Sequence, residues 1–229
     1  MVSAIIVAAG RGSRMGPNVD KLFLEVNGCP VVAHTWRLFD RLPSIAELVV
    51  VVREGLQSSF EELGKKYEFT KPFRLVAGGP ERQDSVWNGL QALAPAAEIV
   101  VIHDGARPCS RPDLIAATIS AAREIGAAVA AQPVTDTIKE SVDGQLATRT
   151  LDRSRLWAVQ TPQTFRTETI RRALTEVRKQ GLVLTDDTAA CELIGQPVKL
   201  VVSNQPNPKV TRPQDVGIVE LLLRERERG

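Results

Sequence analysis

The chain has few cysteines. Its three cysteines, Cys29, Cys109 and Cys191, are widely spaced and form no Cys-x-x-Cys pair, so neither a disulfide framework nor a zinc site is indicated. Each is expected to be a small buried apolar residue. Cys109 lies beside a candidate active-site loop, where it could be accessible.

Histidine is also scarce, and the common catalytic motifs are missing. The two histidines are His34, in a predicted helix, and His103, at the end of a predicted strand, and we interpret both as structural. The chain contains no Gly-x-Ser-x-Gly, His-Glu-x-x-His or Walker A sequence, so no nucleophile with a neighbouring base is indicated. Transfer between phosphates needs none, because its catalysis is mostly positioning and charge neutralisation.

Long apolar runs and a large net charge are absent as well. No run approaches the roughly 20 apolar residues that span a bilayer, and no targeting segment precedes the first predicted strand. The net charge is +2 with both signs spread along the chain, which argues against nucleic acid or a membrane surface as a partner. We therefore expect a cytoplasmic protein with a single domain, residues 1–229.

The chain does contain short apolar runs that alternate with helical patterns. This alternation predicts a doubly wound α/β fold with a mostly parallel sheet, in which ligands bind at the carboxyl ends of the strands. Ser110 and Thr211 are predicted to start the helices that follow them. The predicted strands are Ser3–Ala9, Glu47–Val52, Phe73–Ala77, Ile99–His103, Ala127–Pro133 and Val198–Ser203. The predicted helices are Val31–Phe39, Leu56–Lys66, Arg82–Ala92, Arg111–Ile125, Thr167–Gln180, Asp187–Leu193 and Pro213–Arg224.

One polar segment, Thr135–Asp152, breaks the alternation. It centres on Asp143-Gly144, and Asp-Gly between two extended runs predicts a β-hairpin. A hairpin with no full apolar face is marginal by itself. It is either a solvated edge hairpin or an arm that docks on a second subunit, and we favour the arm.

The most informative segment is a Gly-rich turn directly after the first predicted strand. Gly10 and Gly12 let the main chain approach a ligand, and Arg11, Arg14 and Lys21 add positive charge, so we expect a polyphosphate to bind here. A dinucleotide fingerprint fits poorly, because the glycine spacing is wrong and no acid is placed to bind the ribose.

Three later loops at predicted strand ends carry further candidates. Gly79, Asp84 and Ser85 surround a helix start, where they either bind an anion or a nucleobase edge or simply cap the helix. Asp104 ends a buried strand and either binds a metal–phosphate or ribose or pairs with Arg107. Lys209 precedes the last helix and, taken alone, reads as a surface charge.

Together these blocks resemble the 2-C-methyl-D-erythritol 4-phosphate cytidylyltransferases of the non-mevalonate isoprenoid pathway. The similarity runs through nearly the whole chain in the family's order and spacing. It is carried by residues 8–21, 79–85, 103–108, 136–137, 152–153, 161–163 and 209–211. Two departures stand out. Pro206 and Pro208 replace residues of a run that is often acid-Asn-Ile-Lys in the family, and Gly105 replaces a common Ala.

The resemblance implies a role for each candidate residue. Arg14 and Lys21 would stabilise charge at the α-phosphate of CTP, and the main chain of Ala8, Ala9, Gly10 and Gly12 would cradle its phosphates. Gly79, Asp84 and Ser85 would bind cytosine, and Asp104, Gly105 and Ala106 the ribose and phosphates. Lys209, with Thr137 and Arg153 from the partner's arm, would hold methylerythritol phosphate.

The resemblance also implies a homodimer with shared active sites and a Mg²⁺ ion held mainly through the CTP phosphates, with no dedicated metal-ligating residues. Three other functions stay open at this point. They are a cytidylyltransferase for another polyol phosphate such as ribitol 5-phosphate, a non-catalytic nucleotide-binding module, and, least favoured, a dinucleotide oxidoreductase.

Overall fold

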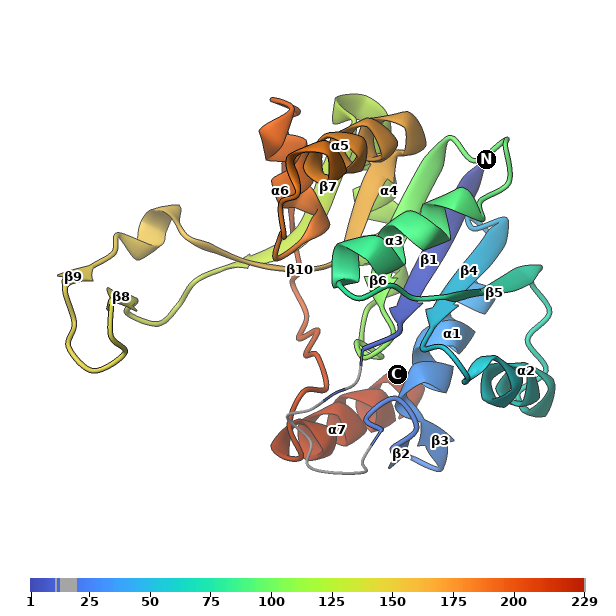
Figure 1. Cartoon of the computed structure of the whole chain (residues 1–229). Coiled ribbons are helices and arrows are strands. Elements are labelled where there is room, and N and C mark those ends of the chain that lie inside the picture. Colours follow the sequence, from blue (N-terminus) through green and yellow to red (C-terminus); the bar gives the residue numbers. More distant parts are fainter. Residues whose placement is uncertain (11, 13–19, 229) are drawn as a thin grey trace.

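A seven-stranded sheet forms the centre of the computed structural model, which describes residues 1–10, 12 and 20–228 (Figure 1). The strand order is β11-β7-β10-β6-β1-β4-β5, in which β10 runs antiparallel to both neighbours and the other pairs are parallel. The strands are β1 (Val2–Ala8), β4 (Glu47–Val52), β5 (Phe73–Ala77), β6 (Ile99–Asp104), β7 (Ala127–Pro133), β10 (Trp157–Arg166) and β11 (Lys199–Val202). This confirms the mostly parallel α/β sheet expected from the sequence.

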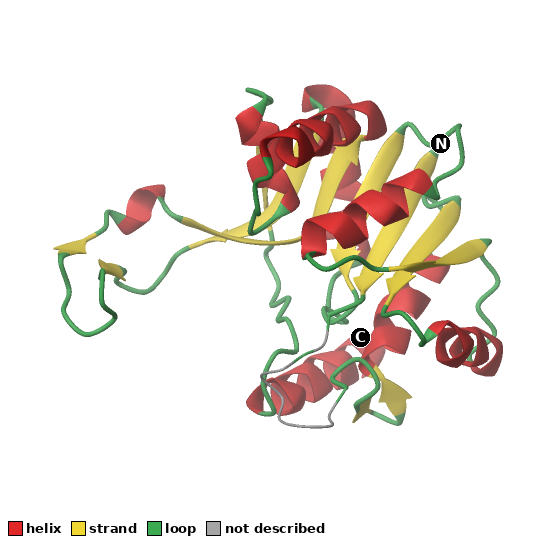
Figure 2. Ribbon diagram, viewed as in Figure 1, coloured by secondary structure: helices red, strands yellow, loops and turns green. Residues whose placement is uncertain are grey.

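Helices cover both faces of this sheet (Figure 2). The strands alternate their side chains between two apolar clusters, so that Ala4 and Ile6 of β1 enter one and Ile5 the other. The helices are α1 (Val31–Asp40), α2 (Gln57–Lys66), α3 (Arg82–Gln91), α4 (Pro112–Ile125), α5 (Thr167–Gln180), α6 (Asp187–Leu193) and α7 (Gln214–Arg228). Residues of α1, α2, α4 and α7 pack into the first cluster and those of α3, α5 and α6 into the second.

Strand β10 is the main element that sequence reasoning missed. Its sequence contains Pro162 among polar residues, and proline within a run argues against a central strand. The structure places this proline at a shift of register between Val159 and Gln163, where Pro162 follows a cis peptide bond. The expected helices are all present. Ser110 does not cap α4, because the residue directly before that helix is Arg111.

The strand order brings the candidate loops to one edge of the sheet. β1 lies between β6 and β4, and β5 follows β4, so the segments after β1, β5 and β6 leave the sheet at neighbouring positions. Gly78, just after β5, donates its N–H to Val52 at the end of β4. Gly105, just after β6, donates its N–H to Val7 of β1 at 2.9 Å. The end of β1 therefore lies between the segments that follow β5 and β6.

The expected hairpin is present and projects from the sheet between β7 and β10 (Figure 1). It consists of β8 (Lys139–Glu140) and β9 (Arg149–Thr150), followed by the 3-10 helix η2 (Arg153–Arg155). Its connection is wider than a two-residue turn. The carboxylate of Asp143 accepts hydrogen bonds from Gln145 N and Leu146 N, and Gly144 has φ +73°. A further two-stranded sheet pairs β2 (Glu25–Val26) with β3 (Cys29–Pro30). No helix among the described residues is long and apolar enough to cross a membrane.

Candidate active site

The described part of the Gly-rich turn folds back over Lys21. Gly12 has φ +64°, and a Cβ there would lie 3.2 Å from side-chain carbons of Lys21, whose own exposure is 9%. Arg53 fastens the turn by donating to the carboxylate of Asp20 at 2.9 Å and to Gly10 O at 3.4 Å. Arg53 was not predicted from the sequence. Arg14 lies outside the described residues, as does Arg11.

The second loop is tightly packed. A Cβ on Gly78 would lie 2.4 Å from Ala9 Cβ, and one on Gly79 would lie 2.3 Å from Asp84 Cβ. Only glycine therefore fits at these positions without a shift of the chain. The hydroxyl of Ser85 accepts the N–H of Gly79 at 3.1 Å.

Asp84 takes part in a capping box at the start of α3. Its carboxylate accepts Glu81 N at 3.2 Å, and it pairs with Arg178 at 3.1 Å. Asp84 therefore has the helix-capping role that its sequence position indicated as one alternative. Contacts of Gly79, Asp84 and Ser85 with a nucleobase stay a prediction.

Asp104, at the end of β6, is the electrostatic centre of the site. Its Oδ2 lies 2.8 Å from Lys209 Nζ and 3.5 Å from Arg107 Nε, and its Oδ1 lies 3.4 Å from Arg82 Nε. The Asp104 N–H donates to Thr161 Oγ1 at 3.1 Å. Burial by itself would raise the pKa of Asp104, but the surrounding cations outweigh it and hold that pKa well below its usual range. Asp104 is therefore an anion in the folded protein.

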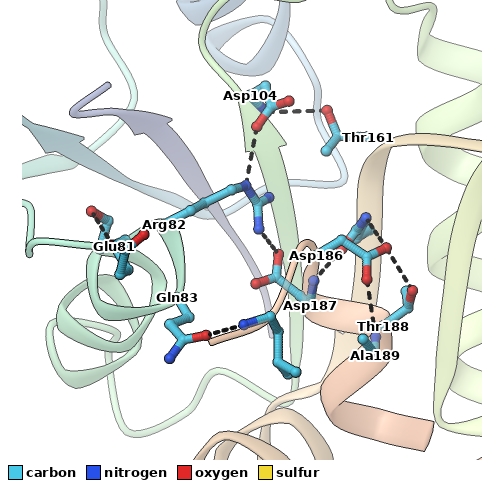
Figure 3. A network of polar contacts seen from close by, with 12 residues as sticks. Glu81, Arg82, Gln83, Asp104, Thr161, Asp186, Asp187, Thr188 and Ala189 are labelled. Carbon is cyan, nitrogen blue, oxygen red and sulfur yellow. Dashed lines mark hydrogen bonds and ion pairs between the residues drawn. The ribbon is translucent and has the colours of Figure 1, made fainter. Parts of the chain in front are cut away.

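Arg82 joins Asp104 to a second buried carboxylate (Figure 3). Its Nη1 lies 2.7 Å from Oδ2 of Asp187, at the start of α6, where only 1% of the Asp187 side chain is exposed. The main-chain N–H of Asp187 donates to the Gln163 side chain at 3.0 Å. Sequence reasoning gave neither Arg82 nor Asp187 a role, because their contact joins residues 105 positions apart.

The Lys209 loop is anchored by its neighbours. Asn207 is 3% exposed and donates from Nδ2 to Thr161 O at 2.8 Å. Arg107 donates to Asn207 O at 2.7 Å, and Val210 N donates to Ala106 O at 2.8 Å. The prolines on either side of Asn207 thus flank a fixed residue, and the pairing with Asp104 makes Lys209 more than the isolated surface charge that its sequence suggests.

The remaining candidates fall into two groups. Thr137 lies in the segment between β7 and β8, and Arg153 begins η2 just after β9. Both therefore belong to the protrusion that carries β8 and β9 away from the sheet (Figure 1). Gly105 and Ala106 lie in the loop itself, where Gly105 O accepts the hydroxyl of Thr35 at 2.9 Å. The structure thus brings together residues from the β1, β5, β6 and β11 ends, but not the two candidates of the protrusion.

Both histidines and all three cysteines are built into the protein interior or its margin. His103 is fully buried, with Nε2 3.1 Å from Arg107 O, and burial lowers its pKa to about 4. His34 Nε2 lies 2.8 Å from Val26 O. Cys109 is buried at 7% exposure, which confirms the burial expected of the three cysteines and excludes the accessible alternative, and burial raises its pKa to about 12. Cys29 and Cys191 are free and buried.

The fold and the loops define a class of protein. A glycine-rich turn at a strand end, a buried aspartate and several cations converge at the carboxyl edge of a parallel sheet. This arrangement suits binding of phosphates and transfer between them. The class is that of the nucleotidyltransferases.

Comparison with known proteins identifies the family within that class. Residues 2–225 match the model of the 2-C-methyl-D-erythritol 4-phosphate cytidylyltransferase family. A relative of that name from Pelotomaculum thermopropionicum is 43% identical over 227 residues, which covers 99% of this chain and 95% of the relative. One from Geobacillus kaustophilus is 44% identical over 223 residues, with 97% of each chain covered.

Solved structures agree. The 4-diphosphocytidyl-2C-methyl-D-erythritol synthase of Anaerococcus prevotii superposes with a TM-score of 0.86 at 31% identity, covering 97% of this chain and 96% of that one. The cytidylyltransferase of Thermus thermophilus gives a TM-score of 0.77 at 30% identity, with coverage of 98% and 100%. The chain belongs to the 2-C-methyl-D-erythritol 4-phosphate cytidylyltransferase family and is a nucleotidyltransferase enzyme.

Proposed function

We propose that this chain transfers CMP from CTP to 2-C-methyl-D-erythritol 4-phosphate by in-line attack, giving 4-diphosphocytidyl-2-C-methyl-D-erythritol and pyrophosphate. The acceptor's phosphate oxygen forms a bond to the α-phosphorus of CTP while the bond from that phosphorus to the pyrophosphate oxygen breaks. The observation that carries this proposal is the convergence of Arg82, Arg107 and Lys209 on Asp104 beside the Gly-rich turn.

The donor half of the site is the edge formed by the β1, β5 and β6 ends. The main chain from Ala8 to Gly12 cradles the CTP phosphates, and Arg14 and Lys21 stabilise the charge that develops at the α-phosphate. Gly79, Asp84 and Ser85 bind cytosine. Asp104, Gly105 and Ala106 bind the ribose and phosphates.

The acceptor half is built around Lys209. A phosphate monoester is already an anionic nucleophile near neutral pH, because its second pKa is ~6. The remaining problem is repulsion between two anions, which at ~4 Å and an effective dielectric of ~20 amounts to ~4 kcal/mol for unit charges. Lys209 reduces this repulsion, and its ion pair with Asp104 fixes where its charge lies.

A divalent cation is the usual partner of nucleotidyl transfer, and we propose Mg²⁺. Among the described residues, no group of three or more His, Cys, Asp or Glu side chains is placed to hold a metal ion. The ion would therefore take most of its oxygen ligands from the CTP phosphates and water. When bound, it neutralises phosphate charge and orients the triphosphate.

We further propose one catalytic domain per chain and a homodimer whose arms, residues 135–152 with the adjoining η2, complete the partner's sites. Val159 and Val202 both pair with Ala131, so their side chains share one face of the sheet. Val159 is 40% exposed and Val202 47%. Exposed apolar side chains at the base of a polar protrusion fit a subunit interface. Thr137 and Arg153 then reach the acceptor's phosphate in trans. A cytoplasmic location stays a prediction from the sequence.

A pyrophosphate-release assay that crosses four nucleoside triphosphates with several polyol phosphates tests the function. Release is expected only with CTP, methylerythritol phosphate and Mg²⁺ together. Release with ribitol 5-phosphate instead would assign the other cytidylyltransferase. Binding of CTP without release in any combination would indicate a non-catalytic module, and an NADH titration tests the oxidoreductase alternative.

A further inference from the structure

The first turn of α3 is clasped by the segment that joins α5 to α6. Three consecutive side chains of α3 contact that segment and its flanking helices. The contacts are Arg82 to Asp187, Gln83 to the main chain of Leu182 and Leu184 at 2.7 and 2.8 Å, and Asp84 to Arg178. The loop of Gly78 and Gly79 leads directly into this turn. Any shift of the clasp therefore moves the donor half of the site.

The Arg82–Asp187 pair is the buried part of this clasp. Asp187 is 1% exposed, and its Oδ1 has no hydrogen-bond partner among the described residues. Arg82 also leaves Nη2 buried and unpaired there. A buried ion pair with unsatisfied atoms is a poor source of stability, because desolvation offsets much of its attraction. The pair instead fixes the orientation of the Arg82 guanidinium, because that group is held by both Asp187 and Asp104.

We infer that Asp187 is a positioning residue for the CTP half of the reaction. Asp187 orients Arg82, and Arg82 in turn holds the Asp104 carboxylate and the first turn of α3 in place. This inference rests on the proposed function. Arg82 spans the two carboxylates, with Nη1 at 2.7 Å from Asp187 and Nε at 3.4 Å from Asp104 (Figure 3). Without the Asp187 charge, Arg82 has one anchor, and its orientation toward Asp104 is no longer set.

The chain offers a matched control in the preceding residue. Asp186 caps α6 by accepting Ala189 N at 3.0 Å and accepts hydrogen bonds from Thr188 and Gln163. Within the described part of the chain, Arg82 pairs with Asp104 and Asp187 but not with Asp186, so Asp186→Asn disturbs the same helix start without touching the path to Asp104. A purely structural role for this region predicts the same effect from both substitutions.

The test compares steady-state kinetics of Asp187→Asn and Asp186→Asn with Mg²⁺, CTP and methylerythritol phosphate. Small misplacements near reacting groups cost up to about 100-fold, so we expect Asp187→Asn to lower kcat/KM for CTP by about 10- to 100-fold. The KM for methylerythritol phosphate and all parameters of Asp186→Asn should stay within about twofold, the scatter of independent effects. Equal losses in the two variants would overturn the inference.

Two further measurements separate this outcome from others. In the double variant Arg82→Met/Asp187→Asn, the loss should match that of Arg82→Met within about twofold, whereas multiplied losses would contradict action through Arg82. If Asp187→Asn does not fold, Arg82→Lys tests the inference instead, because a lysine cannot span both carboxylates. This variant should bind CTP more weakly in calorimetry. Unchanged CTP affinity would overturn the inference. A wild-type enzyme that releases no pyrophosphate refutes the proposed function instead.

Discussion

The side-chain nitrogen of Lys209 lies 2.8 Å from Oδ2 of Asp104, while Arg82 contacts Oδ1 of the same carboxylate. One aspartate thus receives a cation from the loop after β11 on one oxygen and a cation from α3 on the other. Arg107 adds a third at 3.5 Å from Oδ2. In the proposed reaction Asp104 lies where the donor and acceptor halves of the site meet, so removing Lys209 should affect the acceptor first.

We predict that Lys209→Ala lowers kcat/KM for methylerythritol phosphate by about 10²- to 10³-fold, the usual cost of one preorganised charge. Asp104 keeps Arg82 and Arg107 as partners, so the protein should remain folded. Steady-state kinetics with varied acceptor measure the effect, and Lys199→Ala on exposed β11 is the control. A loss no larger than that of the control would remove Lys209 from the acceptor site.

Lys21→Ala and Arg14→Ala should each lower kcat by about 10²- to 10³-fold, because both cations are proposed to meet charge at the α-phosphate. Lys21 is buried under Gly12, which positions its side chain at the start of the donor site. Pyrophosphate release at saturating substrates is the measurement, and substitution of the exposed Lys65 of α2 by Ala is the control. Near-normal kcat in both variants would contradict the assigned donor site.

The proposed sharing of sites between subunits gives a complementation test. Arg153→Ala and Lys21→Ala damage different halves of a shared site, so a mixed dimer contains one intact site and one doubly damaged site. Mixing the two inactive proteins should restore up to about a quarter of wild-type activity, since random exchange makes half of the dimers hybrids. Absence of recovery, with subunit exchange shown by mass spectrometry, would place Arg153 in its own chain's site or in none.

Local sequence patterns predicted the parts of the site that local geometry determines. The glycines of the turn and the aspartate at the end of β6 follow from strand-end chemistry, and the helices follow from their 3.6-residue period. The Arg82–Asp187 contact has no local signature, because it links residues 105 positions apart and depends on how α3 and α6 pack. Strand β10 was missed for a related reason. Its sequence contains Pro162, and its extended structure depends on pairing with β6 and β7 on its two sides.

Two glycines of the site should respond in opposite ways to a methyl group. A Cβ on Gly79 would lie 2.3 Å from Asp84 Cβ, so Gly79→Ala must displace the loop and should raise KM for CTP by about tenfold or more. A Cβ on Gly105 would lie 3.3 Å from Val7 O and Val32 Cγ2, which is tight but tolerable. The reduced entropy of the unfolded chain offsets this contact, so Gly105→Ala should change the free energy of unfolding by less than about 1 kcal/mol. A larger rise in KM for CTP from Gly105→Ala than from Gly79→Ala would show that the Gly79 loop does not shape the donor site.

His103 should make stability depend on pH. Burial lowers its pKa to about 4 in the folded protein, against ~6.5 in the unfolded chain. Between these two pKa values, His103 is protonated in the unfolded chain but not in the folded protein. The contribution of the neutral imidazole to the free energy of unfolding is therefore present at neutral pH and is lost as the pH falls. Linkage puts this loss at about 2 kcal/mol in the free energy of unfolding between pH 7 and pH 5, above the range where most carboxylates titrate.

His103→Gln should flatten this slope, whatever it does to stability at pH 7. His34 is the opposite control. Although burial by itself would lower its pKa, hydrogen bonds to Cys29 and Val26 outweigh that and raise it. Its contribution is therefore present at low pH and is lost as the pH rises through its folded pKa, so His34→Gln should steepen the loss of stability on acidification. Urea denaturation at pH 7, 6 and 5 gives both slopes. An unchanged slope in His103→Gln would mean that another group, not the buried imidazole, governs the response in this range.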